Sequence, residues 1–431
     1  MATGYTYDYL GPDNLVSSDA FVENSRLGTP EYKAVIFNNQ KVSTVGAIEA
    51  LEKFAAQGLK IVFIGPPPNK SYPGNEQDQA RFETAVRHLT TVPNVYHTNS
   101  IDDLPSLLRD NGIIPRISIG CTPSAVYTVY RSSAETDYIY IYNDQNVSPK
   151  CGLNIDAAGV VPYIYDAWTG SQTPLLQYTS TDTQVSIIPT MKANETLILA
   201  LHRKVPQPIC TVAQWSSYIR SVNALGNNLQ VVLMYSPYIL STSTGKVLRF
   251  NAAIPSPTNL TTWQLTIEDW HSAPDRFAIE NKITNHTFNN VALVPWSQIS
   301  AALRPVSGIG HYTATFGPPS DANFTSLVGY INLPPTQHTV RVYLNGKWLG
   351  PIDPVNPVLP LKGLQKNKLY ELRIDVSTTL FNRVKAEADS IWMVGQVASK
   401  ATTKYSTAPY EEYGLVGSVS IDWGYMVDVE C

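Results

Sequence analysis

The chain has 431 residues and a mass of 47.5 kDa, which is too long for one compact domain and suits about two to four. Only 15% of the residues are charged, while 10% are aromatic, with 25 Tyr, 31 Pro and 25 Gly; this favours β-sandwich or jelly-roll domains over helix bundles. A formal net charge of −4 argues against nucleic-acid partners, and no apolar run reaches the roughly 18 residues of a membrane span, so no membrane partner is expected either.

Residues 1–115 predict a small α/β domain of the flavodoxin-like or Rossmann-like kind. The wholly apolar run 34–37 is typical of a strand buried on both faces, and 59–64 predicts a second such strand. Helical spacing of apolar residues predicts helices over 45–57, 77–89 and 101–109, with Gly58 ending the first and a short strand at 95–96. Strands and helices that alternate with short loops indicate a parallel sheet in a three-layer unit.

Residues 116–205 lose the helical period and predict an antiparallel β-sandwich. Alternating or β-branched and aromatic segments are separated by turn residues at intervals of about 8–15 positions. These predicted strands are 125–130, 137–142, 161–165, 175–179, 184–188 and 195–201. Residues 206–257 are interrupted by Pro, Asn and Ser and predict an irregular connecting region.

Residues 258–431 predict a jelly-roll domain of the galactose-binding-like kind. The Asn345-Gly346 pair between two apolar–aromatic segments is a strong signal for a type I′ hairpin turn. The fold class is therefore mixed but mainly β. Short strands are expected at 263–267, 313–316, 329–333, 339–344, 368–376 and 416–421.

Motifs for cofactor, metal or nucleophile chemistry are absent from the sequence. The first strand–helix junction reads FNNQ (37–40) and the second GPPP (65–68), and prolines lack the N–H groups that a phosphate cradle needs. The seven histidines show no metal-ligand spacing, and there is no G-x-S-x-G elbow. We therefore expect no cofactor and no metal. Spacing cannot identify a pair of glycosidase carboxylates, so these remain open candidates: Asp8, Asp13, Asp19, Asp166, Glu268, Asp269 and Asp422.

Polar–aromatic clusters at predicted strand ends are the candidate functional residues. The cluster 268–271 (EDWH) closes the strand 263–267, and the cluster 308–312 (GIGHY) precedes the strand 313–316. Trp348 follows the Asn345-Gly346 turn. Loops at strand ends carry binding surfaces in many β-domains, but an aromatic residue packed on a sheet with its polar tip at the surface gives the same pattern.

The cysteines and sequons bear on the compartment. None of the four cysteines lies in a C-x-x-C pair, and of the three possible pairings we expect Cys121–Cys151, because both flank one predicted β-domain. The N-terminus has no charged or apolar leader region, so a secreted protein would have lost its signal peptide. A secretory or extracellular location is favoured, weakly supported by N-x-[ST] sequons at Asn69, Asn146, Asn194, Asn259, Asn285 and Asn323.

Six blocks of the sequence carry a resemblance to a known family: YDYLGPDN (7–14), YKAVIF (32–37), PYIYDAWTG (162–170), SGIGHYTATF (307–316), VYLNG (342–346) and TLFNR (379–383). They resemble the region that follows the catalytic barrel in fungal proteins related to family 106 α-L-rhamnosidases. The last three blocks resemble the galactose-binding-type jelly roll of such enzymes. In that family the catalytic carboxylates lie in an N-terminal (β/α)₈ barrel, and this chain would begin after it, so the resemblance implies no rhamnosidase activity.

As a stand-alone chain, the sequence resembles the fungal hetero-Diels–Alderases of tropolone sesquiterpenoid biosynthesis. That resemblance implies a cofactor-independent pericyclase, which joins a tropolone ortho-quinone methide to a humulene-type sesquiterpene in an apolar cavity. Small hydrophobic molecules would be its substrates. His311 and His271 would then handle protons or donate hydrogen bonds, Tyr312 would anchor the tropolone oxygens, and Trp270 and Trp348 would wall the terpene.

Two other functions remain open from the sequence. The first is a carbohydrate-binding or accessory module derived from a rhamnosidase-like glycoside hydrolase, with Trp348 and Tyr312 as the sugar platform. The second is a residual glycosidase whose carboxylates cannot be identified by spacing.

Overall fold

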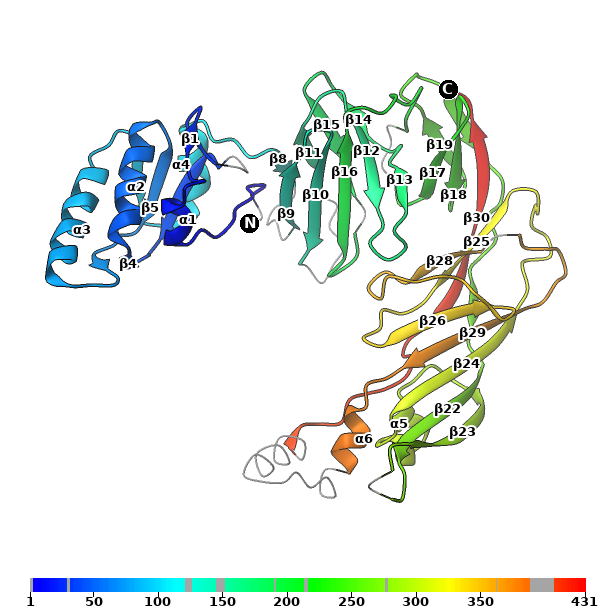
Figure 1. Ribbon diagram of the computed structural model, residues 1–431. Coiled ribbons are helices and arrows are strands. Elements are labelled where there is room, and N and C mark those ends of the chain that lie inside the picture. Colours follow the sequence, from blue (N-terminus) through cyan, green and yellow to red (C-terminus); the bar gives the residue numbers. More distant parts are fainter. Residues whose placement is uncertain are drawn as a thin grey trace. The chain divides into compact units, whose positions relative to one another are not determined.

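The structure, a computed structural model, describes residues 3–28, 32–120, 126–144, 152–189, 191–212, 216–275, 278–361, 363–387 and 407–431. The chain divides into two compact units, a first unit over residues 3–118 and a second unit over residues 119–431. The first unit is α/β, and the second consists mainly of antiparallel sheets (Figure 1). The predicted class, mixed but mainly β, is confirmed.

A three-stranded parallel sheet of order β3-β5-β7 forms the centre of the first unit. Helix α2 ends one residue before its cap Gln57, and Gly58 follows with a φ of +98°, as the apolar period predicts. The elements of this unit are α1 (Pro12–Val16), β1 (Val22–Glu23), β2 (Arg26–Leu27), β3 (Ala34–Asn38), β4 (Val42–Ser43), α2 (Val45–Ala56), β5 (Lys60–Ile64), β6 (Lys70–Ser71), α3 (Glu76–Leu89), β7 (Val95–Thr98), the 3₁₀ turn Ile101–Asp103 and α4 (Leu104–Asp110).

Alternate residues of the central strand β5 face two different cores. Ile61 and Phe63 pack in a core with residues of α2 and α3, such as Phe82. Val62 and Ile64 pack in a second core with residues of α4. Helices therefore cover both faces of β5, as the three-layer prediction requires.

The prediction that β3 is buried on both faces is wrong. Its residues are only half-buried, and Ile36 is exposed. The reason is that β3 lies at the edge of the sheet, with a single neighbour, β5. An apolar run does not distinguish an edge strand from a central one.

Two antiparallel sheets follow along the chain, and each buries alternate residues, the pattern of a β-sandwich. Their orders are β13-β12-β16-β10-β9 and β14-β15-β11-β8. The strands are β8 (Ile117–Ile119), β9 (Val126–Ser132), β10 (Thr136–Asn143), β11 (Leu153–Asp156), β12 (Val161–Tyr165), β13 (Gln172–Pro174), β14 (Thr179–Ser180), β15 (Gln184–Ile187) and β16 (Thr196–His202).

The strand predicted over 175–179 is not formed. Residues 175–178 instead carry the chain from β13, in one sheet, to β14, in the other. Leu176 and Tyr178 are buried there, and their carbonyls accept hydrogen bonds from Val212 N (2.9 Å) and Thr211 Oγ1 (3.2 Å). Burial of a crossing segment produced the apolar pattern that resembled a strand.

Residues 206–257, predicted to be irregular, contain four strands. These are β17 (Ile219–Leu225), β18 (Asn228–Leu233), β19 (Tyr238–Ser241) and β20 (Val247–Phe250). They form two antiparallel hairpins, β17–β18 and β19–β20. The Pro, Asn and Ser residues that hid the pattern lie mostly in the turns and connections around these strands.

Two six-stranded antiparallel sheets contain the remaining strands, with orders β23-β22-β24-β29-β26-β27 and β17-β18-β30-β25-β28, the latter also including β21 beside β30. Their inward residues share one large core, which includes Trp263, Trp296, Tyr312 and Trp423. The elements are β21 (Thr258–Leu260), β22 (Trp263–Ser272), β23 (Asn281–Val291), α5 (Trp296–Ile299), the 3₁₀ turn Ala301–Leu303, β24 (Gly308–Phe316), β25 (Leu327–Asn332), β26 (Thr339–Leu344), β27 (Lys347–Trp348), β28 (Val358–Leu361), β29 (Tyr370–Ser377), α6 (Phe381–Ala386) and β30 (Val419–Val429).

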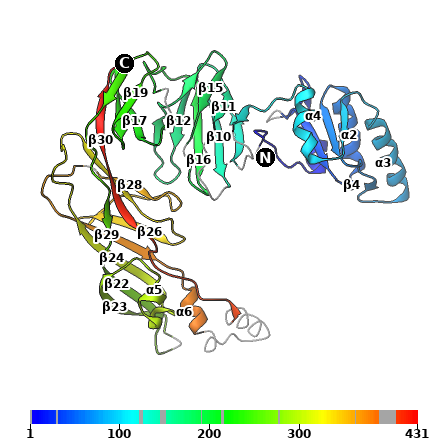
Figure 2. The ribbon, with the colours of Figure 1, turned by 180° about the vertical axis from the view of Figure 1, so that it is seen from behind.

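The last strand, β30, joins the two halves of its sheet (Figures 1 and 2). Its C-terminal part pairs with β18, from the region predicted to be irregular, and its N-terminal part pairs with β21. β25 lies along its middle. Residues 206–257 and the last third of the chain therefore contribute to one sheet.

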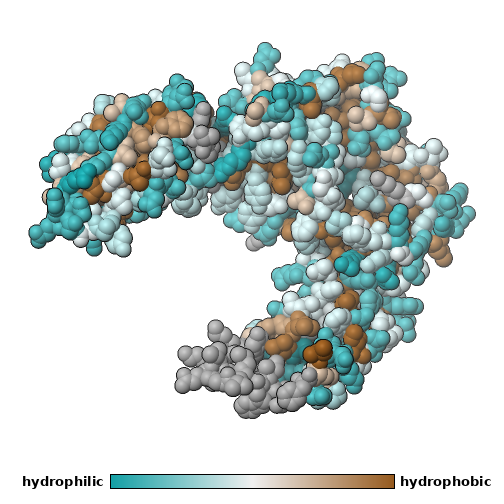
Figure 3. All heavy atoms as spheres, viewed as in Figure 1, coloured by the Kyte–Doolittle hydropathy of each residue, from teal (hydrophilic) through white to brown (hydrophobic). Residues whose placement is uncertain are grey.

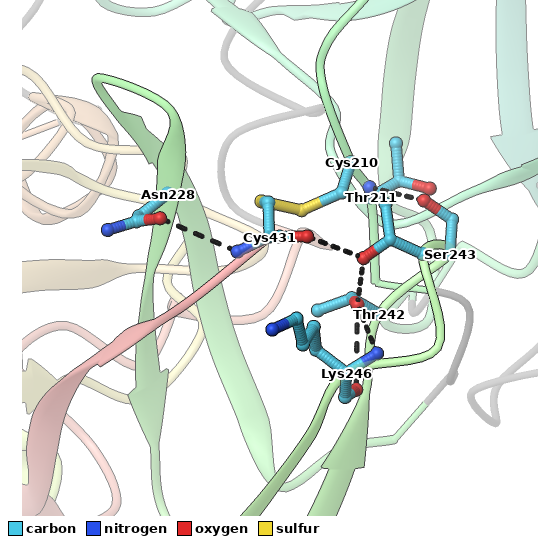
Figure 4. The surroundings of a disulfide bond; sticks show 8 residues. Cys210, Thr211, Asn228, Thr242, Ser243, Lys246 and Cys431 are labelled. Atoms are coloured by element: carbon cyan, nitrogen blue, oxygen red, sulfur yellow. Dashed lines mark hydrogen bonds between the residues drawn. A yellow bond between two sulfur atoms is a disulfide. The ribbon is translucent and has the colours of Figure 1, made fainter.

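The Cys210–Cys431 disulfide fixes the chain end that follows β30 (Figure 4). Asn228 Oδ1 accepts a hydrogen bond from Cys431 N at 3.4 Å, and the Cys431 carbonyl accepts one from Thr244 Oγ1 at 2.9 Å. A disulfide is compatible with the expected oxidising, secretory location. The predicted pair Cys121–Cys151 lies outside the described residues.

None of the helices in the described part of the chain combines the length and the apolar character needed to cross a bilayer. On the surface that Figure 3 displays, the most hydrophobic residues lie in separate groups among hydrophilic and intermediate ones.

Candidate functional site

The outward face of the sheet β23-β22-β24-β29-β26-β27 carries most of the predicted polar and aromatic residues. Pairing places Thr266, His311, Asp375 and Arg341 in one row across four strands. The next row contains Arg373, Tyr343 and Trp348, on β29, β26 and β27. We call this surface the polar face; its site residues are Glu268, Trp270, His311, Tyr343, Trp348, Arg373 and Asp375.

His311 lies between two carboxylates on the polar face. Its Nδ1 is 2.7 Å from Asp375 Oδ1, and its Nε2 is 3.2 Å from Glu268 Oε1. Both ring nitrogens are thus occupied within the protein. His311 orders the carboxylates of two neighbouring strands, and a ligand that needs one of its nitrogens has to displace a carboxylate.

Arg373 connects this cluster to the aromatic side chains. Its Nε is 3.3 Å from Asp375 Oδ1, and its guanidinium carbon lies 4.2 Å from the centroid of the Tyr343 ring. Tyr343 is the cross-strand partner of Trp348, which is half exposed. The result is an aromatic surface next to a charged pair, in which Arg373 can donate hydrogen bonds and Asp375 can accept them.

Trp270 is on the same side of β22 as Glu268. Its Nε1 donates a hydrogen bond to Glu268 Oε2 at 2.9 Å. A Cβ at Gly308 would lie 2.8 Å from Trp270 Cδ1 and 1.9 Å from the Glu268 carbonyl oxygen, so glycine is required for this close approach. The clusters 268–271 and 308–312 therefore lie within β22 and β24, and do not flank shorter strands as predicted.

His271 is not part of the polar face. It follows Trp270 in β22, so it points to the other side of the sheet. Its Nε2 is 3.0 Å from Thr284 Oγ1, and its Nδ1 is 3.3 Å from the Ser272 carbonyl oxygen. The structure therefore does not bring together the two histidines that the sequence nominated.

Tyr312 is also directed away from the polar face, into the core. The side chain is fully buried, and its hydroxyl accepts hydrogen bonds from Trp296 Nε1 (2.8 Å) and Leu415 N (3.0 Å). Burial raises the pKa of Tyr312 to about 12, although the hydrogen bonds from Leu415 and Trp296 act in the opposite direction. A neutral, enclosed phenol that satisfies two buried donors has a structural role.

We expect Tyr312→Phe to lower the free energy of unfolding by about 1–3 kcal/mol, because two buried N–H groups lose their acceptor. Tyr370→Phe is the matched control, since the Tyr370 hydroxyl accepts one hydrogen bond, from Gln365 N at 2.7 Å, and its loss should cost less. Urea unfolding followed by tryptophan fluorescence measures both. A Tyr312→Phe variant that kept wild-type stability but lost ligand binding would give Tyr312 a functional role instead.

A second polar cluster lies at the inner side of β22 and contains Asp269, one of the candidate carboxylates in the sequence. The Asp269 carboxylate accepts a hydrogen bond from Arg383 of α6, and its Oδ2 is 3.3 Å from His286 Nε2. Asn382 is buried beside it and pairs with the backbone of Glu411 through two hydrogen bonds of 2.8 and 2.9 Å. These residues tie α6 to β22 and to the chain before β30. The block 379–383 carried this signal in the sequence.

Two surface hollows lie away from the polar face. One, of about 390 Å³, is lined by residues of α2 and α3 that include Glu49, Arg81 and His88. The other, of about 170 Å³, adjoins the Cys210–Cys431 disulfide. Among the described residues, no group of three or more His, Cys, Asp or Glu side chains is arranged to hold a metal ion.

Comparison with known proteins finds a similar fold in a solved rhamnosidase structure. No protein-family model and no curated protein matches the sequence. The structure of a rhamnosidase from Novosphingobium sp. PP1Y matches over 98% of this chain and 36% of its own, with a TM-score of 0.60 and 17% identity. An exo-carrageenase from Bacteroides ovatus matches over 40% of this chain and 22% of its own, at TM-score 0.24 and 13% identity. A β-glucuronidase from Faecalibacterium prausnitzii matches over 41% of this chain and 33% of its own, with a TM-score of 0.25 and 12% identity.

The rhamnosidase match establishes similarity of fold, in keeping with the resemblance in the sequence. This chain spans about a third of the rhamnosidase's length. At 17% identity, the shared fold does not transfer activity.

Proposed function

We propose that the chain is a carbohydrate-binding accessory module of the rhamnosidase-like kind, and that the polar face contains its binding site. The observation that carries this proposal is the row Trp348–Tyr343–Arg373, next to Asp375. The C–H face of a sugar ring packs against an aromatic ring, and its hydroxyls need donors and acceptors beside that ring. Structural similarity to a rhamnosidase supports the choice of a glycan ligand.

The charged residues are suited to hold sugar hydroxyls because their positions are fixed before binding. His311 and Arg373 both contact Asp375 Oδ1, at 2.7 and 3.3 Å. Hydrogen bonds to charged groups contribute about 1.5–3 kcal/mol, more than those between neutral groups. A carboxylate already held in place by two neighbouring side chains loses little side-chain entropy when it accepts a ligand hydroxyl.

We expect Trp348→Ala to weaken the binding of a rhamnose-containing oligosaccharide by at least about tenfold, since it removes the exposed stacking surface. Isothermal titration calorimetry with the full chain measures this. Trp168→Ala is the matched control, because Trp168 is also 50% exposed, as Trp348 is, but is not on the polar face. The proposed site would be contradicted if Trp348→Ala bound the oligosaccharide as tightly as wild type, or if Trp348→Ala and Trp168→Ala lost the same affinity.

The pericyclase hypothesis stays a prediction without a structural observation in its favour. Such a reaction needs an enclosed apolar cavity for two partners. The two hollows described above are lined by none of the residues predicted to bind the tropolone or the terpene. Trp270 and His311 instead have polar partners on the outward face of a sheet.

A further inference from the structure

A second surface of the second unit, unrelated to the polar face, is unusually rich in tyrosine. In the sheet β13-β12-β16-β10-β9, residues alternate between the interior and the outward face. The outward positions of three strands carry six tyrosines, which we call the tyrosine face: Tyr127, Tyr138, Tyr140, Tyr142, Tyr163 and Tyr165.

Strand pairing makes these rings one continuous layer. Tyr138 and Tyr163 are both Cα partners of Ala200, one on each side, and Ala200 between them is fully buried. The Tyr138 and Tyr165 rings meet edge to face with centroids 6.0 Å apart. Tyr127 and Tyr142 stack at 6.4 Å. These contacts hold four of the six rings in place before any ligand arrives.

The tyrosine face is accessible and has unused hydrogen-bonding capacity. Tyr127, Tyr138 and Tyr140 are 38%, 39% and 44% exposed. In the described part of the chain, no protein group forms a hydrogen bond with the hydroxyls of Tyr127, Tyr138, Tyr140 or Tyr163. The Tyr165 hydroxyl differs, because it lies 3.0 Å from His202 Nε2. Four phenols are thus left to donate and accept hydrogen bonds toward a ligand.

Charge is nearly absent from this surface. The other outward positions of the sheet carry one permanent charge, Arg131, and no carboxylate. They are Val129, Arg131, Thr136, Val161, Gln172, Pro174, Thr196, Ile198, Ala200 and His202. The polar face, in contrast, presents Glu268, Asp375 and Arg373. A ligand of the tyrosine face therefore meets mainly rings and hydroxyls, with Arg131 on β9 and the Asp144 carboxylate, 3.3 Å from the Tyr142 hydroxyl, as the charged groups beside them.

We propose that the tyrosine face binds a linear, uncharged polysaccharide. Tyr138, Tyr140 and Tyr142 recur at every second residue of β10, roughly 6.8 Å apart, so a ligand with its own repeat meets equivalent contacts along the strand. Sugar rings present C–H faces to the phenol rings and hydroxyls to the phenol hydroxyls. A folded protein partner is less suited, because protein interfaces surround their core with a polar, charged rim that this face lacks. This inference goes beyond the proposed function, since it adds a second site with its own class of ligand.

Affinity electrophoresis of the full chain, in gels containing soluble linear galactan or hydroxyethylcellulose, tests the inference. The wild-type protein should be retarded in at least one of these gels and less so in polygalacturonate of equal chain length. Tyr140→Ala should weaken polysaccharide binding about tenfold. Tyr140→Phe should weaken it less, because phenylalanine keeps the ring and removes only the hydroxyl. Tyr9→Ala, which removes a 91% exposed tyrosine of the first unit, is the control and should bind like wild type. Circular dichroism melting verifies that each variant is folded.

The outcomes separate the two binding sites. Loss of retardation in Tyr140→Ala, with normal retardation in Trp348→Ala, supports the tyrosine face independently of the polar face. Loss only in Trp348→Ala overturns it and leaves the proposed function intact. Wild-type mobility in both neutral gels, stronger retardation by polygalacturonate, or equal binding by Tyr140→Ala and wild type overturns the inference. If Tyr140→Ala does not fold, two other variants replace it, Tyr140→Phe and Tyr163→Ala. Wild-type retardation of either folded variant in every gel also overturns the inference.

Discussion

Replacing Cys210 and Cys431 together by serine is expected to lower the free energy of unfolding of the second unit by about 5 kcal/mol. The disulfide joins residues 221 positions apart in the sequence, and chain-entropy models predict the largest effects for the longest closed loops. The loop contains most of the second unit, and β30, directly before Cys431, pairs with three other strands. Without the cross-link, the end of β30 frays more easily from β18.

Tryptophan fluorescence during urea unfolding measures this loss selectively, because all eight tryptophans follow residue 118 and report on the second unit alone. A double alanine variant should show nearly the same loss as the double serine variant, since the missing cross-link dominates. Thr244→Val, which removes only the 2.9 Å hydrogen bond to the Cys431 carbonyl, should cost about 1 kcal/mol. A double serine variant as stable as Thr244→Val would show that the disulfide does not restrict the unfolded chain as proposed.

Local signals in the sequence were sufficient for the first unit. The apolar period of α2, the positive-φ Gly58 after it and the apolar run of β5 all lie within about twenty residues of one another. Residues 206–257 were mispredicted because their strands depend on distant partners. β18 pairs with β30, about two hundred residues further along, and no local pattern identifies such a neighbour.

The candidate site was predictable one residue at a time, but not as an arrangement. Two of the nominated residues, His311 and Trp348, are on the polar face. The groups around them are Asp375, Arg373 and Tyr343, which lie more than thirty residues from His311 in the sequence. Tyr312 was nominated together with its neighbour His311, although the two side chains lie on opposite faces of the sheet. Adjacent residues of a strand point to opposite faces, and composition does not tell which face is buried.

Asp137→Asn is expected to lower the free energy of unfolding by about 3 kcal/mol at pH 7. Asp137 is buried in the first sandwich of the second unit, where its carboxylate accepts hydrogen bonds from Arg203, Ser132 and Tyr130. Burial by itself would raise the pKa of Asp137, but the hydrogen bonds from Arg203, Ser132 and Tyr130 outweigh it and leave the pKa below the ordinary value. Asparagine keeps the shape but removes the charge that Arg203 requires.

The same contact predicts a pH dependence with a definite sign. Because the pKa of Asp137 is lower in the folded than in the unfolded protein, its stabilisation is complete above the unfolded value of about 4 and is lost as the pH falls through the folded value. The stability difference between wild type and Asp137→Asn should therefore be constant near neutrality and shrink under acid. Glu135→Gln is the matched control, since Glu135 pairs with Lys204 at 2.6 Å next to Arg203 but both partners are exposed, and it should cost less than about 1 kcal/mol. The prediction would be contradicted if both variants lost the same free energy of unfolding at pH 7. It would also be contradicted if the stability difference between wild type and Asp137→Asn stayed the same in acid. Either result would mean that the buried Asp137–Arg203 pair stabilises the protein no more than a surface ion pair does.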